Sequence, residues 1–304
     1  MDQLGMVSFI IPSYNSYKTI EDTIKSIFQQ TRLDMIKDVI VVDSSDDQKT
    51  RAVLAQFQFP QLTVIQLNVK TSPALGRNLG AKNAKGDLFC FIDSDVYLSK
   101  DWLKQILEAY ESGHRAGCGA ISLPPFQTPS MLATAQLYLQ FNEYLNSGIL
   151  HDRSFVPSCN LFCGREAFEK VGGFPDLRAS EDTMFCLSLN KIEKIWFVPQ
   201  AECFHIFREE WSSFERNQDL LGRYVIIYRR QYYKKWFYRG LFAVVLFPAF
   251  LTIKLIWIIL RIRKAGKVHQ RAFMKSLGVF LMGVVYWSRG FIKGCFDNDA
   301  VTRR

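Results

Sequence analysis

The sequence predicts an α/β fold with a Rossmann-like, mostly parallel central sheet flanked by helices, plus an apolar helical hairpin at the C-terminus. Through the first hundred residues, short apolar runs rich in β-formers alternate with helical patterns, which is typical of βαβ units. Two long apolar runs, 240–260 and 277–287, come near the end of the chain. We therefore expect an α/β domain at 1–224 and a basic, aromatic-rich helical region at 225–304.

The expected strands are short apolar segments bounded by polar or turn residues: Val7–Ile11, Val39–Val42, Thr63–Leu67, Leu88–Ile92 and Gly117–Leu123. The expected helices lie between or after them, near Thr19–Gln30, Thr50–Phe57, Ala74–Lys85 and Asp101–Glu111. Ser99 is a suitable N-cap for the last of these helices. From 127 to 155 the pattern is helical but less regular, and it carries no motif that identifies a ligand.

The positive charge of the chain is concentrated towards its C-terminal end. The net charge is +9, with +13 in residues 205–304 and −4 in the remainder. Basic clusters that alternate with membrane-length apolar runs favour an anionic membrane surface as the partner and argue against nucleic acid. The seven cysteines are scattered and show no C-x-x-C spacing, so we expect a reduced, cytoplasmic catalytic part.

The run 240–260 is long enough to cross a bilayer, and aromatic residues flank both apolar runs like an interfacial belt. If both runs crossed, the basic connection 261–275 would lie outside, against the positive-inside rule. A re-entrant or in-plane hairpin keeps every basic cluster on one side. We expect attachment to the cytoplasmic face of the cell membrane through this hairpin, with the spanning and in-plane arrangements both open.

Asp93-Ser94-Asp95 directly follows the strand expected at Leu88–Ile92. Ligands of open α/β sheets bind outside the carboxyl ends of the strands. One or two carboxylates plus substrate phosphates are the usual ligands of Mg²⁺ in such sites. The pattern indicates a site for Mg²⁺ or Mn²⁺ beside a diphosphate; the alternative is an ordinary turn, in which Asp and Ser are common.

Two other segments follow neighbouring expected strands. Asp43 ends the second strand, where its carboxylate could accept the N3–H of uracil or thymine; the alternative role is a helix N-cap. Pro12-Ser13-Tyr14-Asn15 follows the first strand, where backbone groups can meet a nucleotide base, or where the segment is only a βα loop.

The helix expected near Ala74–Lys85 carries a third candidate. The Arg77 guanidinium suits phosphate geometry and could steady the diphosphate or the acidic cluster; the alternative is a surface arginine. Gly76 and Gly80 each cost about 1 kcal/mol in a helix relative to Ala. Close approach of the backbone to a ligand would explain them, and so would tight packing.

Taken together, these motifs resemble those of the family 2 glycosyltransferases, whose catalytic domain has the GT-A fold. The matching segments run in the family's order between Val7 and Arg223: Pro12–Asn15, Val41–Asp46, Gly76–Gly80, Gly86–Asp87, Asp93–Asp95, Asn160, Val171–Phe174, Glu181–Asp182 and His205. The resemblance implies an inverting, metal-dependent transfer of a sugar from a nucleoside diphosphate sugar, with UDP or dTDP favoured.

The resemblance also implies roles for the donor-site residues. Asp43 would contact the base, together with the Pro12–Asn15 segment. Asp95 would be the firmer ligand of Mg²⁺ or Mn²⁺, and Asp93 would contact the ribose, or the metal through water. His205 would complete the metal site, although a lone histidine is more often structural.

The general base implied by the resemblance is Asp182, in Glu181-Asp182. Direct displacement at an anomeric carbon needs one carboxylate that takes the acceptor proton, and a single displacement inverts the configuration. The alternative is ordinary helix capping and compensation of the helix dipole, because Ser180 precedes the two acids at the start of an expected helix.

The chain departs from the family in two places. Processive members carry Q-x-x-R-W, whereas the nearest string here, Gln218–Tyr224, has other spacing and no Trp, which favours transfer of one sugar per binding event. Asp46 and Asp47 replace the commoner glycine-containing turn, which leaves the base contacts there open. We expect a lipid-linked or other membrane-borne acceptor.

Two other functions remain as alternatives. A sugar-phosphate nucleotidyltransferase would carry a Gly-rich phosphate loop, and Pro12–Asn15 is not one. A catalytically silent membrane scaffold of a polysaccharide assembly complex would not need Asp93, Asp95 and Asp182 together.

Overall fold

The computed structural model describes residues 5–125, 128–146, 148–177 and 179–297. The chain forms two compact units. We call Met1–Ser122 with Gly148–Ile206 the sheet unit, and Leu123–Ser147 with Phe207–Arg304 the helical unit. The sheet unit of this division ends at Ile206, and the long helix that starts at Trp211 belongs to the helical unit.

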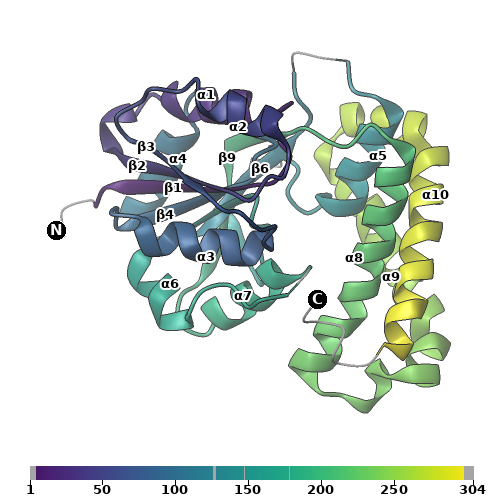
Figure 1. The fold of residues 1–304 in the computed structure, drawn as a ribbon. Helices are drawn as coiled ribbons and strands as arrows, with labels where there is room; N and C mark the ends of the chain where they lie inside the picture. Colours follow the sequence, from purple (N-terminus) through teal and green to yellow (C-terminus); the bar gives the residue numbers. More distant parts are fainter. Residues whose placement is uncertain (1–4, 126–127, 147, 178, 298–304) are drawn as a thin grey trace. The chain divides into compact units, whose positions relative to one another are not determined.

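The sheet unit is built on one mixed sheet of nine strands among the described residues, in the order β3-β2-β1-β4-β8-β6-β9-β5, with β7 beside β9. β3, β2, β1 and β4 run parallel, and β8 is antiparallel to both of its neighbours. The predicted α/β fold with a parallel sheet at its centre is confirmed (Figure 1). The strands are β1 Val7–Ser13, β2 Ile36–Asp43, β3 Leu62–Gln66, β4 Leu88–Ile92, β5 Val96–Leu98, β6 Ala116–Ser122, β7 His151–Arg153, β8 Asn160–Gly164 and β9 Ile195–His205.

Helices cover both faces of this sheet. Phe9 and Ile10 are adjacent in β1 and therefore point to opposite faces. Phe9 meets Trp102 of α4, with ring centroids 5.9 Å apart, whereas Ile10 faces Gly80 of α3. The helices of the unit are α1 Ile20–Phe28, α2 Gln48–Leu54, α3 Pro73–Asn83, α4 Trp102–Glu111, α6 Arg165–Val171 and α7 Glu181–Leu189.

The two glycines of α3 are explained by packing. A Cβ on Gly80 would lie 2.5 Å from Cγ2 of Ile10, and one on Gly76 would lie 3.2 Å from Cβ of Pro12. Real Cβ atoms do not approach neighbours this closely at Gly80, so a side chain there would push α3 away from β1. Of the two explanations left open by the sequence, tight packing against the strand accounts for both positions.

The helical unit consists of α-helices, of which the last three are joined by short connections, with a 3₁₀ turn at Trp236–Tyr238. They are α5 Met131–Gln140, α8 Trp211–Tyr233, α9 Gly240–Ala265 and α10 Lys267–Phe296. α8 and α10 run side by side (Figure 1). Gly222 and Gly290 make this possible, because a Cβ on either one would overlap the backbone carbonyl of Trp287 or Asp219 on the facing helix.

The two apolar runs of the sequence have different structural roles. The run 240–260 lies within α9, which is the one described helix that is long and apolar enough to cross a membrane. α9 buries a narrow stripe containing Ala243 and Phe247 and leaves most of its other apolar side chains exposed. The run 277–287 lies within α10, where Gly283 packs tightly against Leu139 of α5 and Phe214 of α8. One face of this second run packs against other helices, whereas Leu281, Met282 and Val285 are exposed.

Candidate active site

The predicted site residues meet at the carboxyl edge of the parallel strands. β1, β2 and β4 end at Ser13, Asp43 and Ile92, and β1 pairs with both β2 and β4. Asp93 follows β4 immediately, and its backbone N–H donates to the carbonyl of Cys159, 3.4 Å away. This edge is where open α/β sheets bind ligands.

The Asp43 carboxylate is fully buried and surrounded by donors. Its Oδ1 accepts from the hydroxyls of Ser13 (2.9 Å) and Ser45 (2.6 Å) and from the Ser45 backbone N–H (3.3 Å). Its Oδ2 accepts from Nε2 of Gln66, at 2.9 Å. The helix cap after β2 is supplied by Asp47, which accepts from the Thr50 N–H, so Asp43 does not serve as an N-cap.

The turn after β1 is held to the turn after β2 by polar contacts. β1 continues through Pro12 and Ser13, so the turn itself starts at Tyr14. The Tyr14 hydroxyl and the Asn15 amide both donate to Asp46, at 2.9 and 2.7 Å, and the Asn15 amide and then the Tyr14 hydroxyl hold the pKa of that carboxyl below its usual range. Asn15 has φ of 51°, a left-handed conformation that asparagine tolerates better than most residues. Asp46, which replaces the commoner glycine, therefore orders both turns.

Arg77 is a buried connection between two acidic motifs. Its Nη2 lies 2.6 Å from Oδ1 of Asp93 and its Nη1 lies 2.9 Å from Oε1 of Glu181, with 3% of the arginine side chain exposed. Burial acts against the charged form, but the Asp93 and Glu181 carboxylates outweigh it and raise the pKa of Arg77. The guanidinium also lies 5.4 Å from the ring centroid of Phe174. Of the two roles suggested by the sequence, the structure shows contact with the acidic cluster.

Asp182 lies in the first turn of α7, next to Glu181. Its Oδ1 accepts the Thr183 backbone N–H at 2.6 Å. Burial and then the Glu181 charge raise the pKa of Asp182 to about 7, although the Thr183 N–H and Arg77 act in the opposite direction. A carboxyl group with a pKa near neutral is suited to general base catalysis. Ser180 has φ of 63° and its side chain makes no cap hydrogen bond, so the capping part of the alternative is wrong. Glu181 and Asp182 both lie in the first turn of α7, where acidic side chains also interact favourably with the helix dipole.

Asp95 and His205 are neighbours across two paired strands. β5 pairs with β9 so that Val96 lies opposite His205, and this brings Nε2 of His205 to 3.7 Å from Oδ1 of Asp95. The Asp95 side chain is 36% exposed, and that of His205 is 12% exposed. No described group of three His, Cys, Asp or Glu side chains could hold a metal ion by itself. A carboxylate and an imidazole nonetheless fit a divalent cation whose other ligands are substrate phosphates and water.

Two residues of the site were not assigned a role from the sequence. Asn78 follows Arg77, and its side chain donates to the Phe174 carbonyl at 2.8 Å and accepts the Phe174 N–H at 2.9 Å. Glu181 holds Arg77. The sequence signal that could have identified Asn78 was its position next to Arg77 in one motif. Consecutive helix residues point in different directions, so they can bind two separate segments.

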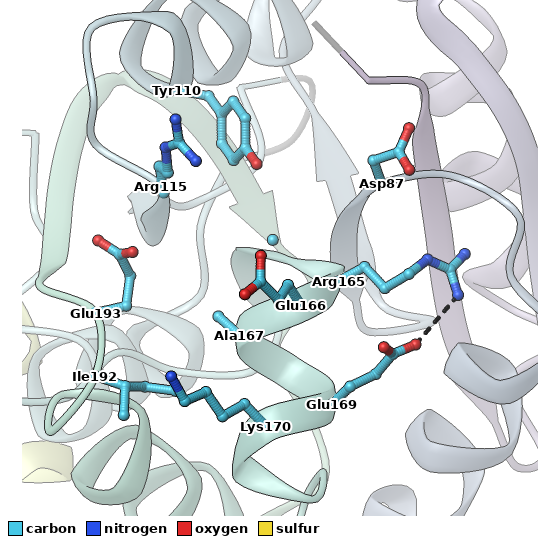
Figure 2. A pocket seen from close by; sticks show the side chains of 11 residues that line it. Asp87, Tyr110, Arg115, Arg165, Glu166, Ala167, Glu169, Lys170, Ile192 and Glu193 are labelled. Carbon is cyan, nitrogen blue, oxygen red and sulfur yellow. Dashed lines mark ion pairs between the residues drawn. The ribbon is translucent and has the colours of Figure 1, made fainter. Parts of the chain in front are cut away.

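The sheet unit also contains cavities that the predicted site residues do not line. A cavity of about 370 Å³ is lined by Asp87, Tyr110, Arg115 and the start of α6, where Arg165 pairs with Glu169 at 3.5 Å (Figure 2). Asp87 precedes β4 whereas Asp93 follows it, so this cavity is at the opposite edge of the sheet. A neighbouring cavity of about 380 Å³ lies between α3 and α6. Neither is lined by a predicted site residue.

An α/β sheet with acidic side chains at its carboxyl edge is typical of proteins that bind a phosphate-containing ligand together with a divalent cation. The sequence profile of "Glycosyl transferase family 2" matches residues 8–172. The chain therefore belongs to glycosyl transferase family 2.

Individual proteins agree with this assignment. The "Glycosyltransferase AglE" of Haloferax volcanii is 25% identical over 176 residues, which are 57% of this chain and 57% of that protein. This chain thus matches little more than half the length of that relative. The mannosyltransferase PcManGT of Pyrobaculum calidifontis, in complex with GDP-Man and Mn²⁺, is 15% identical with a TM-score of 0.64 over 96% of this chain and 88% of that one. S. aureus TarS 1–349 with UDP-GlcNAc is 18% identical, with a TM-score of 0.55 over 95% and 89%. These structures confirm the predicted GT-A fold.

Proposed function

We propose that this protein transfers a single sugar from a nucleoside diphosphate sugar, with UDP or dTDP favoured, to a hydroxyl of a lipid-linked saccharide at the membrane. The observation that carries the proposal is the Arg77 bridge, which ties the Asp93 loop to the acid pair containing Asp182. Arg77 thereby connects Asp93, a proposed donor-binding carboxylate, with the segment that contains Asp182, whose pKa is raised. The solved relatives bind nucleotide sugars, GDP-Man in one and UDP-GlcNAc in another, which supports a donor of this class.

Asp182 would act as the general base. It would accept the proton of the acceptor hydroxyl while that oxygen attacks the anomeric carbon and the nucleoside diphosphate leaves. One displacement inverts the anomeric configuration, and no nucleophilic carboxylate is required. The near-neutral pKa of Asp182 supports this role, because the carboxylate is then available at neutral pH and still basic enough to take the proton.

Asp95 and His205 would hold a divalent cation, with Asp93 beside it. Mg²⁺ or Mn²⁺ would supply Lewis-acid stabilisation of the diphosphate leaving group. The arginine contact keeps Asp93 in a fixed position at the same edge. The Mn²⁺ in the mannosyltransferase complex supports this assignment.

The helical unit would attach the enzyme to the membrane through the exposed apolar side chains of α9. Val245 and Ile253 are 69% and 55% exposed on this helix. Basic side chains at the α9–α10 connection, including Lys264 and Lys267, would meet anionic headgroups. Replacing Val245 and Ile253 by Glu should abolish sedimentation with anionic vesicles, and Lys264→Gln with Lys267→Gln should weaken it mainly at low salt. Unchanged sedimentation of the Glu variant would contradict attachment through α9.

The activity is tested by donor turnover with the detergent-extracted full chain, Mn²⁺, and UDP-, dTDP- and GDP-sugars, with and without lipid-linked saccharides. Metal-dependent turnover of one donor, lost in Asp95→Ala and in Asp182→Asn, is the expected result. Asp152→Asn is the matched control, since this exposed carboxylate pairs only loosely with Lys194, at 3.7 Å. Formation of a nucleotide sugar from a sugar phosphate would instead show a nucleotidyltransferase. Folded protein that binds no nucleotide would favour the silent scaffold.

A further inference from the structure

The strand register places Gln66 directly beside Asp43. β2 and β3 are parallel, with Asp43 opposite Gln66 as the last pair of the register, and the Leu67 N–H donates to the Asp43 carbonyl at 2.8 Å. Both side chains therefore leave the same edge of the sheet on the same face. Gln66 is an exposed residue, whereas Asp43 is completely buried. An exposed carboxamide thus covers a buried carboxylate.

The hydrogen bonds of Asp43 leave little room for a further donor. Oδ1 already accepts three hydrogen bonds from Ser13 and Ser45, which come from the ends of β1 and β2. Those donors are buried and belong to the ordered turns. Oδ2 accepts a single bond, and its donor is the Gln66 amide at 2.9 Å. A carboxylate oxygen has about two acceptor sites, so Oδ1 is filled and an incoming N–H has to use Oδ2. Asp43 is 0% exposed, so a donor from solvent reaches Oδ2 only after a covering side chain such as Gln66 has moved.

We propose that Gln66 is a specificity-determining cap that occupies the base-binding oxygen of Asp43 and is displaced by the N3–H of a uracil or thymine base. The inference rests on the proposed nucleotide-sugar donor and adds the residue that controls access to its base. The amide of Gln66 is a neutral N–H donor like the imide of uracil, so the two compete for Oδ2. Because Gln66 is exposed and on the last residue of an outer strand, its side chain can turn into solvent without disturbing the core.

Removing the cap should improve nucleotide binding. In Gln66→Ala and in Gln66→Met, which is similar in length but donates no hydrogen bond, the Kd for UDP should fall by about two- to tenfold, the range expected for one exchanged hydrogen bond. CDP should not gain, because N3 of cytosine carries no hydrogen. Gln58→Ala is the control, since Gln58 is an exposed glutamine in the loop before β3.

The measurement is calorimetric titration of the full chain with UDP and with CDP in the presence of Mn²⁺. Tighter UDP binding in both Gln66 variants, with CDP and Gln58→Ala unchanged, supports the cap. UDP binding that weakens or stays the same in either variant overturns it, as does an equal gain for CDP. If the unmodified chain binds neither nucleotide with Mn²⁺, both the proposed nucleotide-sugar donor and the proposed role of Gln66 are wrong. If the unmodified chain binds UDP but the Gln66 variants bind it no more tightly, only the role of Gln66 is wrong.

Discussion

Each unit of the chain contains an arginine that pairs with two carboxylates, and the two arginines lie in opposite surroundings. In the sheet unit, the Arg77 side chain is 3% exposed between Asp93 and Glu181. In the helical unit, Arg289 is 44% exposed and pairs with Glu215 and Asp219 along the outside of α8 and α10, whose contact is made by glycines and aromatic rings. A buried charge is costly unless its partners stay in place, whereas an exposed pair contributes little. The comparison indicates that the buried pairs of Arg77 hold residues of the sheet unit's site in place, whereas the exposed pairs of Arg289 contribute little to the contact between α8 and α10.

The largest effect should come from removing the proposed base of the sheet unit. Asp182→Asn keeps the size of the side chain but removes its basicity, and general base catalysis typically contributes about 10²–10⁴-fold. We expect a fall of that size in kcat, with donor binding and vesicle sedimentation unchanged. Initial rates at saturating donor, with Asp152→Asn as reference, measure it. A change of less than about tenfold would assign the proton transfer to another group.

The second test compares the two arginines directly. Arg77→Met leaves two carboxylates without their cation in a buried place, which should cost about 3–5 kcal/mol of unfolding free energy. Arg289→Met removes exposed pairs and should cost less than about 1 kcal/mol. Urea titrations of both variants measure the difference. Equal losses would contradict the distinction between the two units.

The third test concerns packing in the helical unit. In Gly222→Ala the added methyl group would overlap the Trp287 carbonyl, so α8 and α10 have to separate, at a cost of about 1–3 kcal/mol. Gly278→Ala is the matched control, because nothing lies within 4 Å of its added Cβ and it is inside α10. The control should be stabilised by up to about 1 kcal/mol. Thermal unfolding of both variants distinguishes a close helix contact from a loose one.

The last test concerns the pH dependence of sugar transfer by the sheet unit. The pKa of Asp182 is raised to about 7, so its carboxyl is protonated below that pH and cannot act as a base. The kcat/KM for the donor should therefore rise about tenfold per pH unit below 7 and level off above it. In Asp182→Asn, kcat/KM should no longer rise with pH in this range. If kcat/KM of the variant still rises with pH below 7, the titrating group is a residue other than Asp182.

Much of the sheet unit followed from local sequence patterns. Strand β4 has the predicted bounds, and the other predicted strands and helices are present with ends that differ by a few residues. Asp43 was predicted to end a strand, and Asp93 and Asp95 were predicted to follow one, at the place where open α/β sheets bind ligands; the structure confirms these positions. The roles of Asp43, Asp95, Asp182 and His205 in donor and acceptor chemistry remain predictions.

By itself the sequence determined the α/β class, the family motifs and the apolar character of α9, because these depend on residue type, short spacing and strand-helix alternation. Only the tertiary structure decided which residues Arg77 and Asn78 hold, since their partners lie 16 to 104 positions away. It also decided that one face of run 277–287 packs against other helices and that Gln66 covers Asp43, because both depend on which surface comes to lie opposite. The periodicity of the sequence shows that a helix face is apolar or where a strand ends. Which other segment packs against that face or strand depends on contacts between residues that are distant in the sequence.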